Sequence, residues 1–443
     1  MNSYFEQFTT WRMIMRLYKA ELYKIYSKKI FVFSALAVPT IMLLYFSIFV
    51  INAQTTINGV KYTGYQAIQM DREITKEFEG VLTDEKVTQI IEKYGFPNGV
   101  SQRRNEFLDK NFLNNFVMCE FSDGYFHGWD DYHVGTLTYP IAETELGKAS
   151  ESVGKPIVLE YSYGWTVFNR VLETGCLLAL PFILLALSPI FSEERHINMR
   201  QILFTTKEGK TTDVTAKILA GMTVAVGAYA VIFVLNLGLV WLVFGLDGGD
   251  CLYKWVMEEN YVRTWNNYHN ISTMFIKDFI LLAIGFSFLG IVEAAAITLY
   301  FSAHSASPFQ AVIISALCLI APVCFSTFGR GNYNSILYIA GQLFNVFLLG
   351  LAVMSFIPTF SNKKYQFIVQ ALCCILPLTV GIYFRRKFPF YYTLPFLLII
   401  TEAYGDIDIL LTYYPWIRGA ISLFVIATSV VFVICSHKKY RTL

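Results

Sequence analysis

The chain has 443 residues, of which 55% are hydrophobic, 16% aromatic and 15% charged. An average soluble domain carries roughly 25% charged residues, and it does not need long apolar runs repeated along the whole sequence. The net charge is +2, so no overall field favours nucleic acid as a partner. Lipid is therefore the expected solvent for much of the chain, and no nucleic acid is expected to bind.

Residues 1–29 predict a cytoplasmic amphipathic helix. Apolar and aromatic side chains recur at steps of three and four between Phe5 and Ile25, and the Arg and Lys residues lie off that face. A helix with this pattern lies in a membrane interface over anionic headgroups, and membrane lipids are thus expected contacts.

Residues 30–52 predict a first membrane span, because 23 residues pass without a charge. The span starts after a long charged segment, so we expect it to stay rather than be cleaved as a signal sequence. Residues 53–165 form a polar insert with 10 Lys and Arg against 17 Asp and Glu, which predicts an extracellular position. Thr83 followed by Asp84 and Glu85 is typical of a helix start, and the insert is expected to be mostly helical.

Residues 166–384 are expected to form the core transmembrane bundle. Spans are predicted at about 169–191, 218–246, 279–301 and 309–328. The loop 192–217 is rich in Lys and Arg and is therefore expected in the cytoplasm. The short connection 302–308 predicts a tight hairpin on the same side.

The last third of the chain leaves two topologies open. Apolar segments at 335–358, 365–384, 388–401 and 419–436 cannot all cross if both termini are cytoplasmic, so one of them is expected to be re-entrant. If the basic cluster 385–387 is inside, the re-entrant segment is 335–358; if it is outside, the re-entrant segment is 388–401. Either way the fold is an all-α polytopic bundle of about eight crossings plus one re-entrant segment, in which 385–443 supplies an extra helix pair and a cytoplasmic tail.

Two motifs that suggest soluble chemistry are incomplete. Gly209-Lys210-Thr211-Thr212 matches the end of a phosphate-binding loop, but Phe204 stands where that loop needs a glycine. His127 and His133 have no ligand-rich pattern around them, so they are interpreted as surface residues rather than a metal site. We therefore expect no enzyme activity, no catalytic residue, no metal and no bound cofactor on this chain.

Glu293 lies near the middle of the predicted fourth span, where an isolated charge costs several kcal/mol. It either lies on a substrate or proton path, or is a protonated acid hydrogen-bonded to a neighbouring helix. Cys119 and Cys251 fall in segments expected outside the cell, where they either pair or remain thiols.

The order of these parts resembles the permease subunits of ABC-2 type ABC transporters. The resemblance is carried by Lys19-Ala20-Glu21-Leu22-Tyr23-Lys24, by the stretch from Phe191 to Lys210, by Lys217 and by Phe301-Ser302-Ala303. In that family a Glu-containing turn is followed by a short helix that docks on the ATPase, and here Glu193, Glu194 and residues 197–206 match these parts. The insert of about 113 residues and the apolar pair after residue 384 depart from a simple six-span permease.

The resemblance implies a multi-pass permease of a bacterial cell membrane, paired with a second permease chain that is identical or homologous. A cytoplasmic ABC ATPase dimer would bind the ATP and Mg. The implied ATPase-coupling residues are Lys19, Glu21, Lys24, Glu193, Glu194, Arg195, Arg200 and Lys217; for Arg195 and Arg200 ordinary positive-inside anchoring is the alternative.

The large insert is similar to those of Gram-positive permeases that export antimicrobial peptides or bacitracin-like drugs, which suggests that substrate class by analogy. Two hypotheses place the chain in another functional class of protein. One is a membrane-embedded sensor or accessory protein whose extracellular domain binds a ligand without transport. The other is a secondary transporter, which the lack of an internal repeat disfavours.

Overall fold

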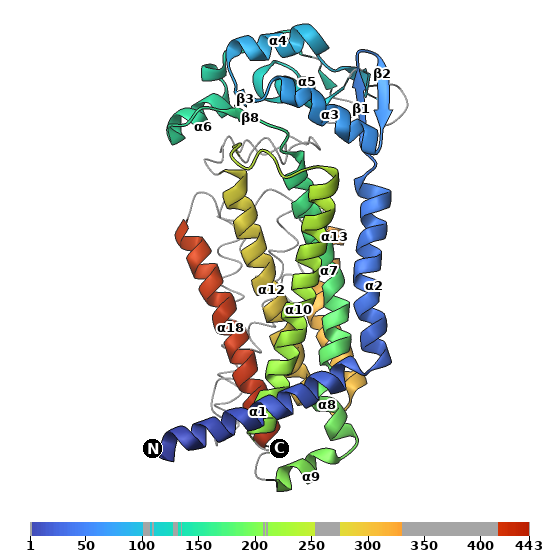
Figure 1. Cartoon of the computed structure of the whole chain (residues 1–443), viewed down its shortest axis with the longest axis vertical. Coiled ribbons are helices and arrows are strands. Elements are labelled where there is room, and N and C mark those ends of the chain that lie inside the picture. The colour runs from blue at the N-terminus through green and yellow to red at the C-terminus, as the bar shows by residue number, and fades with distance from the viewer. Residues whose placement is uncertain are drawn as a thin grey trace.

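The computed structural model describes residues 2–100, 107–108, 110–126, 132–133, 135–206, 209, 211–252, 275–329 and 415–442. This part of the chain is predominantly helical (Figure 1). A bundle of long helices carries a small domain at one end, residues 54–162, which we call the insert domain. The N-terminal helix and the C-terminal end of the last helix lie at the opposite end, which we call the basal end.

The helices of the bundle differ in orientation, because the first lies across the basal end and the long ones run between the two ends (Figure 1). Their bounds are α1 (Asn2–Tyr26), α2 (Lys29–Tyr45), α7 (Tyr163–Leu187), α8 (Pro189–His196), α9 (Met199–Thr205), α10 (Thr212–Val243), α12 (Ile276–His304), α13 (Pro308–Gly329) and α18 (Pro415–Thr442). A π-helical turn, Phe46–Val50, extends α2 towards the insert domain.

Four helical segments of the described chain are long and apolar enough to cross a membrane: Lys29–Val50, Tyr163–His196, Thr212–Val243 and Ile276–His304. They contain the predicted spans 169–191 and 279–301 and most of 30–52 and 218–246, which extend past the helix ends at Val50 and Val243. Helix α13 covers the predicted fifth span. Of the predicted connection 302–308, residues 305–307 form the turn, whereas 302–304 and 308 belong to α12 and α13.

The predicted segments 335–358, 365–384 and 388–401 and the basic cluster 385–387 lie outside the described residues. The count of about eight crossings and the choice of re-entrant segment therefore stay predictions. Helix α18 covers the predicted segment 419–436 but runs on to Thr442, so residues 437–442, expected as a tail, are helical.

The insert domain is a small mixture of helices and very short strands. Its helices are α3 (Tyr65–Glu77), α4 (Asp84–Tyr94), α5 (Phe112–Phe121), a 3₁₀ turn (Ile141–Glu143) and α6 (Glu145–Val153). Its strands are β1 (Gln54–Ile57), β2 (Val60–Thr63), β3 (Gly80–Val81), β4 (Asn98–Val100), β5 (Phe107–Leu108), β6 (Tyr125–Phe126), β7 (Tyr132–His133) and β8 (Val158–Leu159). They form two-stranded antiparallel pairs, β1–β2, β3–β8, β4–β5 and β6–β7.

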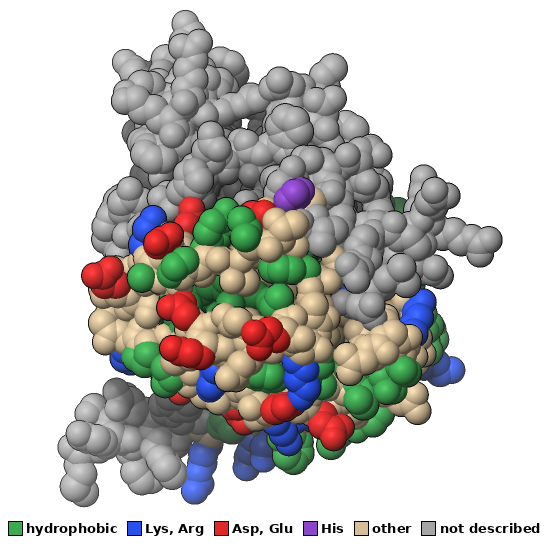
Figure 2. All heavy atoms as spheres, turned by 90° about the horizontal axis from the view of Figure 1, so that it is seen from above, with side chains coloured by type: hydrophobic (Ala, Val, Ile, Leu, Met, Phe, Trp, Pro, Cys, Tyr) green, Lys and Arg blue, Asp and Glu red, His purple; other side chains and the backbone are tan. Residues whose placement is uncertain are grey.

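Local sequence explains two of these elements. Asn58 and Gly59 both have positive φ, 51° and 77°, which is the requirement of the tight hairpin turn that joins β1 to β2. The hydroxyl of Thr83 accepts a hydrogen bond from the amide of Lys86, so the predicted helix start at Thr83 is confirmed. On the described part of the face in Figure 2, Asp and Glu side chains lie around a group of hydrophobic ones.

Polar contacts tie the insert domain to the loop that follows α10. The guanidinium of Arg72 lies 3.2 Å from Asp247, and the amide of Gly248 donates to Glu160 at 2.6 Å. Cys251 is buried and donates to the carbonyl of Val158 at 3.2 Å. Both Cys251 and Cys119 are thiols, so of the two alternatives left by the sequence the disulfide is not formed.

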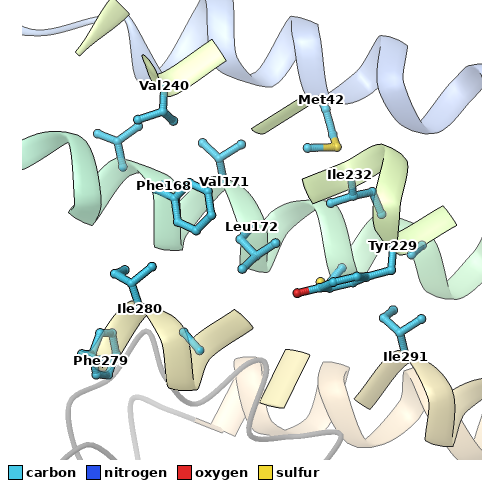
Figure 3. Close-up of a cluster of buried hydrophobic side chains, with 14 of the residues drawn as sticks. Met42, Phe168, Val171, Leu172, Tyr229, Ile232, Val240, Phe279, Ile280 and Ile291 are labelled. Carbon is cyan, nitrogen blue, oxygen red and sulfur yellow. The ribbon is translucent and has the colours of Figure 1, made fainter. Parts of the chain in front are cut away.

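The cluster of buried side chains in Figure 3 is apolar and includes residues of α2, α7, α10 and α12. Met42 of α2, Leu172 of α7, Ile232 of α10 and Ile291 of α12 are each at most 2% exposed. The one polar group labelled in this view, the Tyr229 hydroxyl, donates to the carbonyl of Ile284 at 2.8 Å and so joins α10 to α12. A core of this kind fixes the long helices as one packed unit.

The outer surface of the long helices is also apolar. Phe33 is 76% exposed, Leu281 71% and Val234 66%, and Leu36, Trp241 and Leu242 are similarly exposed. Soluble monomers rarely expose contiguous apolar surface on this scale. The surface therefore matches a hydrocarbon solvent.

Candidate functional site

Five charged side chains from three helices meet at the basal end of the bundle. They are Glu21 and Lys24 of α1, Glu194 of α8, and Asp213 and Lys217 of α10; we call them the ionic cluster. Helix α1 lies across the basal end, where it meets the starts and ends of the long helices (Figure 1). Three acids and two bases leave the cluster with an excess of one negative charge if all are ionised.

Lys217 is the centre of the ionic cluster. Its side chain is 0% exposed, and its Nζ lies 3.1 Å from Glu21 Oε1 and 3.2 Å from Glu194 Oε1. It also bonds the carboxylate of Asp213, which stands one turn earlier in α10. Asp213 is in the first turn of that helix, where a negative charge is favoured by the helix dipole. All three donor positions of the ammonium group thus face carboxylates.

Glu194 receives further partners from both ends of the chain. Lys24 Nζ donates to its Oε1 at 2.8 Å, and the hydroxyl of Tyr440 in α18 donates to its Oε2 at 2.6 Å. Tyr440 is 0% exposed, and its ring packs against Phe191 and Phe204. One carboxylate therefore connects α1, α8, α10 and α18.

The burial of these groups decides what the ionic cluster contributes. A buried ion pair adds little net stability compared with apolar residues, because desolvation offsets the attraction. Removing one partner is different, since it leaves an uncompensated buried charge that costs about 3–5 kcal/mol. The ionic cluster therefore acts mainly to hold α1, α8 and α10 in one arrangement, and the hydrogen bond from Tyr440 to Glu194 adds α18.

Ser302 and Arg195 make the polar contacts that hold α8 against the hairpin between α12 and α13. Ser302 Oγ accepts from the amide of Phe191 at 3.0 Å and donates to the carbonyl of Ser188 at 2.6 Å, across the break between α7 and α8. Arg195 donates to the carbonyls of Ala303 at 2.7 Å and Ser305 at 3.1 Å. Helix α8 is thus held from both sides.

Helix α9 begins after Asn198, which has a positive φ of 57° and turns the chain out of α8. Arg200 donates to the backbone carbonyl of Tyr440 at 2.7 Å, and its guanidinium lies over the rings of Phe204 and Tyr440. Met199 and Ile202 of α9 are 45% and 66% exposed, and Ile197, which precedes Asn198, is 54% exposed. We call these three side chains the apolar face of α9.

The sequence-predicted coupling residues divide into groups in the structure. Glu21, Lys24, Glu194 and Lys217 meet in the ionic cluster, and Glu193 pairs beside it with Lys28. Arg195 and Arg200 are half-buried and bound to carbonyls of this chain, which differs from the exposed position that docking on a partner requires. Lys19 is exposed.

The sequence analysis did not predict three residues that take part in these contacts, namely Lys28, Asp213 and Tyr440. Asp213 could have been found, because an acid four residues before a Lys at a helix start is a favourable pair. Tyr440 lies 246 residues from Glu194 and has no local pattern that would reveal the contact.

Glu293 is 0% exposed within the bundle, and the hydroxyl of Thr428 in α18 donates to its Oε1 at 3.0 Å. Its Oε2 has no hydrogen-bond partner among the described residues. This geometry matches the hydrogen bond to a neighbouring helix that was one of its two interpretations.

No group of three or more His, Cys, Asp or Glu in the described ranges is arranged to hold a metal ion. Asp123 lies 3.7 Å from His133 and accepts hydrogen bonds from the backbone amides of residues 136 and 137. Comparisons with protein-family models, with curated proteins and with solved structures give no match.

Proposed function

We propose that this chain is the membrane-spanning permease subunit of an ATP-driven transporter of the ABC-2 type. It would lie in a bacterial cell membrane with both termini in the cytoplasm, and the ATP and Mg would be bound by a separate ATPase dimer. The observation that carries the proposal is the combination of a solvent-facing apolar face at α9 with the contact between Arg200 of α9 and Tyr440 of α18, which also bonds Glu194 in the ionic cluster.

The apolar face of α9 supports a protein partner at the basal end. Met199 and Ile202 of α9 and Ile197 just before it are exposed. Helix α9 lies beyond the ends of the long helices (Figure 1). The preceding and following residues are polar and charged, so the segment belongs in water rather than lipid. Exposed apolar side chains rimmed by polar ones are typical of a protein interaction site.

The ionic cluster supports transmission from that partner. Force on α9 reaches α18 through Arg200 and the backbone of Tyr440, and reaches α1 and α10 through Glu194 and Lys217. ATP binding would favour one arrangement of the helices if the ATPase contacts α9 differently in its two states. Alternating access then follows from rigid movement of the helices in the packed bundle.

The insert domain supports a substrate of cationic, amphipathic character on the opposite side. The segment 53–165 has an excess of seven acids over bases, and exposed apolar residues such as Leu137 and Tyr139 accompany them. A negative surface attracts cationic peptides and raises their association rate. We therefore propose an antimicrobial peptide or a similar antibiotic as the exported or cleared substrate, moved through a path shared with a second permease chain.

Co-purification of the chain from native membranes, followed by an assay of ATP hydrolysis, tests the proposal. We expect a nucleotide-binding chain to accompany it and to hydrolyse ATP. An Ile197→Glu/Ile202→Glu double variant should lose that partner, whereas Leu137→Glu, an equally exposed apolar residue on the insert domain, should keep it. Recovery of the folded chain without any nucleotide-binding partner would contradict the proposal.

The second candidate is a sensor or accessory protein whose extracellular domain binds a ligand without transport. The compact insert domain favours it, because the domain has its own buried residues, including Ile68, Val117 and Leu146. This candidate predicts ligand binding by the insert domain with no ATPase in the purified material. Uptake or release of a labelled cationic peptide in proteoliposomes, dependent on ATP, would exclude it.

A further inference from the structure

A groove of about 250 Å³ opens on the side of the bundle between α2, α7 and α10. The groove exists because small residues stand at its floor, namely Ala35 of α2, Ala179 of α7 and Gly227 of α10. Val38 and Ile232 also line it. A Cβ atom added to Gly227 would meet no atom within 4 Å, so the hollow reaches the backbone of α10. Water does not occupy such an apolar hollow stably.

The groove lies within candidate membrane spans and faces outward. Val231, which also lines it, is 54% exposed, and the neighbouring outer surface of α2 and α10 is apolar. The lining residues 224–232 of α10 span about 12 Å along the helix axis at 1.5 Å per residue. One leaflet of a bilayer contributes roughly 15 Å of hydrocarbon, so the groove matches the length of part of one acyl chain.

An aromatic residue lines the groove where α1 ends, and a basic residue follows it in the chain. Tyr26 lines the groove at the end of α1, and its ring lies 5.0 Å from that of Phe31. Tyrosine prefers the level of the lipid headgroups, where its ring is in an apolar layer and its hydroxyl is in a wet one. Lys29, three residues later, is exposed, and the ion pairs of the described residues use Lys24 and Lys28 but not Lys29.

We propose that this groove is a binding site for an anionic glycerophospholipid from the leaflet at the basal end. One acyl chain fills the hollow beside Gly227, and the phosphate of the headgroup is held near Lys29. Charge complementarity favours this occupant, because Arg16 and Lys19 of α1 are exposed at the same end and anionic lipids gather beside such residues. The site depends on insertion of the chain in a membrane and is independent of any ATPase.

Photo-crosslinking in lipid nanodiscs tests the site. The full chain is placed in phosphatidylcholine nanodiscs containing a small fraction of phosphatidylglycerol with a diazirine midway along one acyl chain, and the labelled peptides are mapped. We expect label on residues 224–232. Gly227→Phe should lower it by about tenfold, the effect of losing two buried methylene groups. Gly238→Phe is the matched control, since Gly238 is in the same helix and also has open space around it.

A second arm examines the headgroup. With wild-type chain, a phosphatidylcholine that carries the same diazirine should label residues 224–232 several-fold less than the phosphatidylglycerol, and Lys29→Gln should remove the difference. Equal labelling by the two lipids would overturn the anionic part of the proposal. Equal labelling of the Gly227→Phe and Gly238→Phe variants would overturn the groove as a lipid site. Disulfide crosslinking between two copies of a Gly227→Cys variant would overturn it as well, because a second chain would then cover the groove.

Discussion

The hydroxyl of Tyr440 donates a hydrogen bond to Oε2 of Glu194 at 2.6 Å, although 246 residues separate them in the chain. The contact joins α18 to Glu194 of α8, a residue for which the family resemblance implies a role in ATPase coupling. Because Glu194 also bonds Lys24 and Lys217, the two ends of the chain meet at one carboxylate. Changes at either end are therefore expected to act on the same arrangement of helices.

Tyr440→Phe removes only the hydroxyl and keeps the buried ring. Glu194 Oε2 then loses its hydrogen-bond donor in a buried place, and we expect a loss of about 1–3 kcal/mol in unfolding free energy. The measurement is thermal or denaturant unfolding of the purified chain in detergent. Tyr23→Phe is the control, because Tyr23 is 74% exposed and its loss should change stability by no more than about 0.5 kcal/mol. Equal stability of the two variants would show that the contact contributes nothing.

Lys217→Met leaves the carboxylates of Glu21, Glu194 and Asp213 without their shared ammonium group. We expect a loss of about 3–5 kcal/mol, the cost of uncompensated buried charge. Lys19→Met should be nearly neutral in the same unfolding measurement, since Lys19 is exposed. The Glu194→Gln/Lys217→Met double variant should lose less than the sum of the single variants, by about 0.5–3 kcal/mol, because the two residues interact directly. Strict additivity would mean that the pair is not coupled.

Gly164 and Gly238 should respond in opposite directions to replacement by alanine. A Cβ on Gly164 would lie 2.2 Å from the carbonyl oxygen of Gly245, whereas a Cβ on Gly238 meets nothing within 4 Å. Gly164→Ala should therefore destabilise the chain by about 1–3 kcal/mol through overpacking. Gly238→Ala should stabilise α10 by up to about 1 kcal/mol, because alanine is the better helix former. Melting temperatures of the two variants, compared with wild type, check both signs.

Asp123 gives the insert domain a dependence on pH. Its carboxylate accepts from the amides of Thr136 at 2.8 Å and Leu137 at 3.0 Å, and these bonds hold the pKa of Asp123 well below its usual range. Because the folded pKa is lower than the unfolded value of about 3.9, the stabilisation is complete above that value and is lost as pH falls below it.

Hydrogen exchange of the amides of Thr136 and Leu137, corrected for intrinsic rates, measures this effect. In the wild type, protection should be complete at about pH 6 and should fall as the pH is lowered from about 4 towards about 2. In Asp123→Asn it should already be low at the higher pH and change little. A variant with wild-type protection at both pH values would refute the role given to this carboxylate.

The long helices could be predicted from the sequence because length without charge is a direct physical requirement for crossing lipid. The predicted span 279–301 lies within α12, and the predicted span 309–328 lies within α13. Thr83 was predictable as a helix start, since a cap depends only on its immediate neighbours. The strands of the insert domain were not, because strands of two to four residues carry no readable alternation.

The candidate site was predictable only in part. The family resemblance pointed to Glu21, Glu194 and Lys217, but not to how they meet, since their contacts join segments far apart in the chain. It also suggested Arg195 and Arg200 as docking contacts, whereas both are used within the chain. The sequence did not predict the exposed apolar face of α9, because the exposed side depends on which residues of α9 contact Tyr440.

The most direct test of the proposed function places a photo-crosslinking amino acid at Ile202 in the native host and identifies what it captures. We expect one dominant product, a nucleotide-binding ATPase chain, whose yield changes when ATP is depleted. The same amino acid at Leu137 of the insert domain, 63% exposed against 66% for Ile202, should capture no ATPase. Capture of lipid alone at Ile202, with the chain folded and inserted in the membrane, would contradict the assignment of α9 as the ATPase contact.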